Sequence, residues 1–152
     1  SGFLSEGLAE YSAVSLLAKE KGEKQLRKFL KYELDKYLIG RYSEQKFEPT
    51  IVQTEGHPYI HYNKAGLMMY TLSDFIGKDV FNSALGRFID KFRYQSNPYT
   101  NIGEFVKTIR EDTPDDLQYL ITDTFEKITL YENKAKEASA VENGDGTFTV
   151  TM

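Results

Sequence analysis

Residues 5–21 read SEGLAEYSAVSLLAKEK, and this stretch begins the part of the chain that decides the fold. Apolar side chains recur in it at three- and four-residue spacing, at Leu8, Tyr11, Val14 and Leu17, which predicts an amphipathic helix over residues 6–21. Gly22 then interrupts the pattern, and the same spacing resumes in a second expected helix over residues 23–39.

The rest of the chain continues this helical character up to a final hairpin. Further helices are expected over residues 62–76 and 79–93, then one capped by Thr100 or Asn101, and a last one that begins at Thr113-Pro114. Residues 41–61 break the pattern, with a short extended candidate at Ile51-Val52. Residues 134–142 and 147–152 flank the turn sequence NGDG, which predicts a β-hairpin.

These patterns predict a mainly α fold: a helical bundle over residues 1–130, followed by a β-hairpin segment over residues 131–152. The absence of Met at position 1, and the end of the chain inside an alternating run, indicate a piece of a longer protein.

Composition narrows the class of protein. With 40% hydrophobic and 28% charged residues over 152 positions, the chain resembles a globular domain, and no apolar run approaches the length of a membrane span. A net charge of −4 without a basic stripe argues against nucleic-acid binding. There is no cysteine, so disulfides and thiolate metal sites are excluded.

Two acidic residues near the start of the first expected helix are candidates for chemistry. An acid such as Glu6 in a first helical turn is commonly explained by the helix dipole alone. Gly7, the next residue, lowers the helix propensity, which suggests that another part of the structure approaches the backbone closely at this position. Glu10 lies one turn further on the same face, where two carboxylates repel each other unless a cation is near.

A second candidate lies where the long connection meets the third helix, in the sequence YIHYNKAG of residues 59–66. A tyrosine there could hold its hydroxyl over a cleft as an oxyanion donor, or could serve only as a half-buried aromatic anchor. His57 and His61 flank Pro58 without metal-ligand spacing, so surface or packing roles are favoured for them.

Taken together, these segments resemble the M1 family of zinc aminopeptidases, the gluzincins. That family carries H-E-x-x-H, then an Asn/Ser-Glu-Gly-x-Ala-x-Tyr helix, and later a Tyr-x-Lys-Gly motif at a helix start. FLSEGLAEY at residues 3–11 and YNKAG at residues 62–66 are similar in order and spacing, and the likeness extends over nearly the whole chain. Ala65 stands where the family usually has Gly, and no H-E-x-x-H occurs in the sequence.

The resemblance implies specific roles. Glu6 would be the third ligand of a His₂Glu zinc site, Tyr62 would stabilise the tetrahedral oxyanion, and Glu10 and Lys64 would support the site or the structure. The chain would then be the back half of a gluzincin catalytic domain of bacterial type, acting on peptides together with the upstream half. By itself it is expected to be inactive and to bind no stoichiometric zinc.

Two other interpretations remain open. One is a catalytically dead M1-like module that serves as a binding or scaffold domain, attached to a membrane transporter. The other is a helical domain that matches the motifs by chance. The bacterial M1 proteins that the chain resembles include some fused to transporter-like membrane segments, so the resemblance is compatible with a membrane tether in a longer protein, as it is with a cytoplasmic location.

Overall fold

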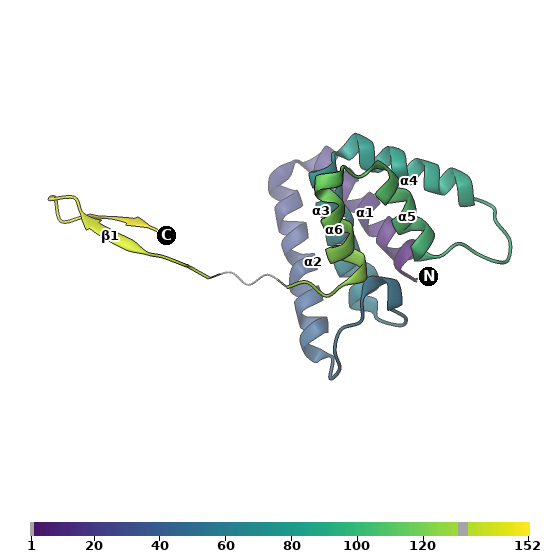
Figure 1. Cartoon of the computed structure of the whole chain (residues 1–152), viewed down its shortest axis with the longest axis horizontal. Helices are drawn as coiled ribbons and strands as arrows, with labels where there is room; N and C mark the ends of the chain where they lie inside the picture. The colour runs from purple at the N-terminus through teal and green to yellow at the C-terminus, as the bar shows by residue number, and fades with distance from the viewer. Residues whose placement is uncertain (1, 131–133) are drawn as a thin grey trace.

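The structure is a computed structural model that describes residues 2–130 and 134–152. Within these residues the mainly helical prediction and the hairpin are both confirmed, and Figure 1 shows their arrangement. The α-helices are α1 (Gly2–Lys21), α2 (Glu23–Ser43), α3 (Ala65–Ile76), α4 (Lys78–Phe92), α5 (Ile102–Asp112) and α6 (Gln118–Ile121). Short 3₁₀ turns are η1 (Ile51–Gln53) and η3 (Asp115–Leu117), π-helical turns are η2 (Ile60–Lys64) and η4 (Thr122–Glu126), and the strands are β1 (Ser139–Glu142) and β2 (Phe148–Thr151).

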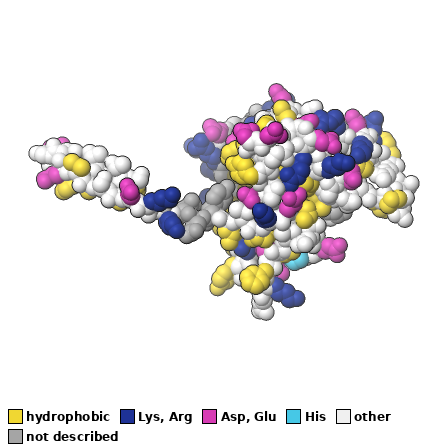
Figure 2. Space-filling view, in the orientation of Figure 1, with side chains coloured by type: hydrophobic (Ala, Val, Ile, Leu, Met, Phe, Trp, Pro, Cys, Tyr) yellow, Lys and Arg dark blue, Asp and Glu magenta, His cyan; other side chains and the backbone are white. Residues whose placement is uncertain are grey.

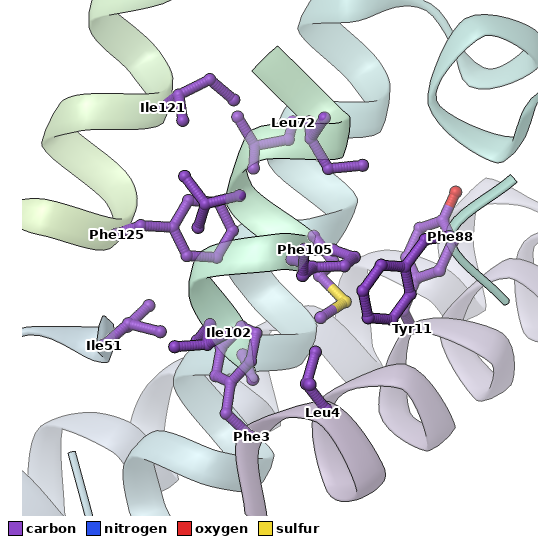
Figure 3. Close-up of a cluster of buried hydrophobic side chains, with 14 of the residues drawn as sticks. Phe3, Leu4, Tyr11, Ile51, Leu72, Phe88, Ile102, Phe105, Ile121 and Phe125 are labelled. Atoms are coloured by element: carbon purple, nitrogen blue, oxygen red, sulfur yellow. The ribbon is translucent and has the colours of Figure 1, made fainter. Parts of the chain in front are cut away.

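A core of aromatic and branched side chains joins the helices. α1 packs along η2 and α3, α2 lies against α1, and α4 packs on both α3 and α5. At the centre of the core (Figure 3), Phe125 meets Phe3 and Phe105 edge to face, at ring-centroid distances of 5.8 and 6.0 Å. This geometry is favourable for aromatic rings, and it connects the two ends of the helical part.

The approach of α1 to α3 is unusually close, and it explains the glycine of the first motif. A Cβ built on Gly7 would lie 2.7 Å from the Cβ of Ala65, and one built on Gly66 would lie 3.0 Å from the Cβ of Glu10. Real Cβ atoms do not approach to the first of these distances, so the two helices can touch here only because position 7 has no side chain. Ala65, which stands where the family pattern usually has Gly, therefore fits against α1 because Gly7 has no side chain.

Two local predictions were wrong. Ile51-Val52 does not form an extended segment but begins the 3₁₀ turn η1, because Ile51 is anchored in the core and Thr54 N–H bonds back to its carbonyl. The last helical stretch does not begin at Thr113-Pro114 but at Asp115, and the Thr113 hydroxyl instead donates to the Ile109 carbonyl of the preceding helix at 2.8 Å. The last helical stretch consequently begins as η3 and ends as the π-helical turn η4.

The cap of α5 was predicted correctly, as the Asn101 side chain accepts a hydrogen bond from the Glu104 N–H at 3.2 Å.

Only part of the apolar face predicted for α2 is buried, because Leu34 and Leu38 remain about half exposed while Glu33 is buried. Acidic, basic and apolar side chains alternate over the face seen in Figure 2.

The hairpin lies apart from the helices in Figure 1. Its strands pair antiparallel with Ala140 opposite Val150, and in the turn the Asp145 carboxylate accepts from the Thr147 N–H at 2.9 Å. No helix among the described residues is long and apolar enough to cross a membrane.

The close contact between α1 and α3 gives a pair of matched glycine substitutions with opposite expected signs. Gly7→Ala should destabilise the chain by about 1–3 kcal/mol, because the new methyl group overlaps Ala65. Gly86→Ala, in the exposed interior of α4 with no atom within 4 Å of the new Cβ, should stabilise it by about 0.5–1 kcal/mol. Urea unfolding followed by circular dichroism measures both, and equal effects would contradict the packing described here.

Candidate functional site

The two sequence motifs meet in the structure at the π-helical turn η2. Three successive residues of this turn each contact a carboxylate from a different element: Tyr62 meets Glu6 of α1, Asn63 meets Glu33 of α2, and Lys64 meets Glu48 of the α2–η1 connection. A π-helical turn inserts an extra residue into a helix and is frequent at functional sites. The turn continues directly into α3 at Ala65.

The first of these contacts brings together the two residues that the resemblance singled out. Tyr62 is 40% exposed and Glu6 is partly exposed. A side-chain hydrogen bond with Glu6, assisted by slight desolvation, raises the pKa of the Tyr62 phenol. The hydroxyl therefore stays protonated at neutral pH and remains available as a hydrogen-bond donor.

Glu6 belongs to a group of three carboxylates with Glu10 and Glu33. Burial, then the charges of Glu33 and Glu6, raise the pKa of Glu10. Glu33 is 5% exposed and accepts a hydrogen bond from the Asn63 amide at 2.6 Å. Among the residues that the structure describes, no lysine or arginine forms an ion pair with any of the three.

Lys64 points away from this group, into a second polar cluster beneath the turn. It is 8% exposed and forms an ion pair with Glu48, whose other oxygen accepts from the Tyr37 hydroxyl at 2.8 Å and the Arg41 guanidinium at 2.9 Å. Burial and the hydrogen bond to Glu48 raise the pKa of Tyr37 to about 12. Lys64 is thus separate from the exposed side of Tyr62.

The histidines have packing and hydrogen-bonding roles in this structure. His57 Nδ1 lies 3.1 Å from the Thr54 hydroxyl, and its Nε2 lies 3.6 Å from Glu44. His61 packs against the backbone of Gly2, and burial lowers the pKa of its imidazole. Its Nε2 atom is buried without a hydrogen-bond partner.

Sequence reasoning missed Glu33, Glu48 and Asn63. Glu33 lies on the buried face of α2, between the apolar positions Leu26 and Tyr37, and a charge on such a face is a signal that could have been followed. Glu48 follows α2 in an irregular segment, where no periodicity marks a residue as buried.

Within residues 2–130 and 134–152, the donor chemistry around η2 fits one ligand of a zinc site. Carboxylate oxygen is an accepted zinc ligand, and Glu6 offers one that is partly exposed and without a cationic partner among the described residues. Over the same residues, no three histidine, cysteine, aspartate or glutamate side chains gather closely enough to hold a metal ion.

Comparison with protein-family models defines the class of protein as a peptidase domain. The model described as "Peptidase family M1 domain" matches residues 1–125, which is most of the chain. The chain therefore belongs to peptidase family M1, a family that is generally zinc-dependent. Searches of the curated proteins and of the solved structures gave no significant match.

The cluster of Glu6, Glu10 and Glu33 leads to a prediction about how the stability of the chain depends on pH. Because the folded chain raises the pKa of Glu10, it binds more protons than the unfolded chain above the ordinary pKa of a glutamate, and its stability falls as the pH rises through that region. Glu10→Gln should therefore stabilise the chain by about 0.2–0.5 kcal/mol at pH 7, the size of a like-charge pair one turn apart, and the gain should vanish near pH 4.

The control is Glu20→Gln, on an exposed part of the same helix. Urea titrations of all three proteins at pH 4, 5, 6 and 7 provide the comparison. A gain from Glu10→Gln that persists undiminished at the lowest pH would show that charge repulsion is not its cause.

Proposed function

We propose that this chain is the part of a zinc aminopeptidase catalytic domain that supplies one metal ligand, Glu6, and one oxyanion donor, Tyr62. One observation carries the proposal. In a chain that belongs to family M1, the Glu of the first motif and the Tyr of the second, far apart in the sequence, come into hydrogen-bonding contact.

The metal would be held by Glu6 and by two histidines of an H-E-x-x-H segment, which these 152 residues do not contain. Zinc bound in such a site lowers the pKa of its water and polarises the scissile carbonyl. The close packing of Gly7 on Ala65 fixes the part of α1 that carries Glu6, and so limits the positions its carboxylate can take.

Tyr62 would act on the oxygen of the scissile carbonyl. Its phenol has a raised pKa, so it keeps its proton at neutral pH and can donate a hydrogen bond as negative charge develops on that oxygen. The hydroxyl now points to Glu6, so the donor lies beside the proposed metal ligand, where the reacting carbonyl has to sit.

The substrate in this proposal is the N-terminal residue of a peptide, as in the aminopeptidases that the chain resembles. The competing proposal, a catalytically dead binding or scaffold module, requires the same fold without a complete site. Ala65, the departure from the family motif, packs against Gly7 without an overlap and therefore gives no support to that alternative.

The test uses a protein in which an H-E-x-x-H segment, as the proposal requires, precedes this chain, with aminoacyl p-nitroanilides as substrates. Tyr62→Phe should keep zinc, measured by plasma mass spectrometry, and lose about 10²–10³ in kcat, the usual cost of one oxyanion donor. Glu6→Ala should lose zinc and activity together.

Two matched controls lie on α2 and α1. Tyr42→Phe removes the hydroxyl of a tyrosine that is 92% exposed, and Glu20→Ala removes an exposed carboxylate. Both should leave zinc content and kcat unchanged. A wild-type protein that holds no zinc and hydrolyses no aminoacyl substrate would reject the enzyme and favour the binding module.

A further inference from the structure

We propose that Glu48 is a positioning residue for Tyr62: its buried carboxylate ties the π-helical turn η2 to α2 and so sets the direction in which the turn presents the Tyr62 hydroxyl. The catalytic consequence rests on the function proposed above, whereas the structural link from Glu48 to the turn does not.

The first step is the placement of Glu48 itself. Its side chain is 1% exposed, and both of its carboxylate oxygens have partners. One oxygen forms an ion pair with the Lys64 ammonium, and the other accepts hydrogen bonds from Tyr37 at 2.8 Å and from Arg41 at 2.9 Å. Tyr37 and Arg41 lie one turn apart on α2 and are themselves joined by a hydrogen bond of 3.0 Å. The carboxylate is therefore held rigidly by the end of α2.

The second step leads from this carboxylate to the turn. Lys64 is the last residue of η2, and its side chain is 10% exposed, so its ammonium has little access to water as a substitute for Glu48. Tyr62 stands two residues earlier, and side chains two apart on a helix do not share a face. Holding Lys64 against α2 thus turns Tyr62 toward α1, where Glu6 lies.

The entry to the turn is fixed to the same helix end. Tyr59 donates to Glu44 at 2.6 Å and stacks on Tyr37 with ring centroids 6.1 Å apart. Gly40 allows this contact, because a Cβ there would lie 2.4 Å from the Cβ of Tyr59. With both ends of η2 attached to α2, the turn keeps its extra residue and cannot relax into an ordinary α-helix by rotation.

A purely structural role for Glu48 predicts a different outcome and can be separated from positioning. If Glu48 only neutralises the buried lysine, then removing both charges should restore what the unpaired Lys64 has cost, since the Arg41 side chain is 28% exposed and water can replace its partner. If Glu48 positions the turn, the double variant regains stability but not the orientation of Tyr62, because the link between the turn and α2 is still missing.

The experiment compares Glu48→Gln, the double variant Glu48→Gln/Lys64→Met and the control Glu104→Gln, a partly exposed carboxylate that pairs with exposed Lys91. All are made in the protein that includes the H-E-x-x-H segment. We expect Glu48→Gln to lower kcat by about 10–10²-fold, the effect of a small misplacement, with KM and zinc content changed less than twofold. We expect the double variant to regain the thermal midpoint and to keep the low kcat.

Hydrogen exchange followed by mass spectrometry provides a readout that needs no activity. Exchange should rise in peptides covering residues 60–66 in both variants and stay unchanged in α4 and α5. Should Glu48→Gln fail to fold, the double variant, which has no unpaired buried lysine, decides alone.

The outcomes separate the two proposals. Recovery of kcat and of exchange protection in the double variant, or a uniform rise in exchange across all helices, would overturn the positioning role. An inactive wild-type protein whose variants show the local rise in exchange would reject the proposed function and leave the link from Glu48 to the turn in place.

Discussion

The contact between α1 and the helix formed by η2 and α3 is the constraint on which the rest of the site depends. Gly7 lets α1 approach until its backbone meets Ala65, and on the other side of the contact Gly66 admits the stem of Glu10. A closely packed interface of this kind has little freedom to slide, because any shift brings atoms into overlap. Glu6 and Tyr62, which come from the two packed segments, are therefore held within hydrogen-bonding distance of each other.

The same packing creates an electrostatic problem that the fold resolves only in part. It gathers the carboxylates of Glu6, Glu10 and Glu33, and no described lysine or arginine pairs with them. The cations Lys64 and Arg41 are instead committed to Glu48, on the other side of the turn. Like charges this close, together with burial, raise the pKa of Glu10 and lower the stability of the folded chain at neutral pH.

Much of the chain was predictable because its signals are local. The spacing of apolar residues and the positions of glycine and proline predicted the α2, α4 and α5 helices and the hairpin. The cap of α5 could be predicted because the Asn101 side chain itself makes the capping hydrogen bond. Glu6 and Tyr62 were chosen as candidate site residues because two short motifs keep their order, and their roles stay a prediction. The segment around Ile51 and the start at Thr113 were misjudged, since burial of Ile51 and a hydrogen bond from Thr113 back to α5 decided those conformations. Neither effect is visible in neighbouring residues.

The sequence alone determined the class of fold, through apolar spacing, and the two residues on which the chemistry is proposed to rest. Only the tertiary structure decided how those residues meet. It turned the start of the third helix into a π-helical turn, buried Glu33 and Glu48, and gave Tyr62, Asn63 and Lys64 a separate carboxylate each. The physical reason is that a buried charge or an inserted residue is tolerated only when partners from distant segments surround it. The residues next to it in the sequence do not indicate which distant residues those partners are.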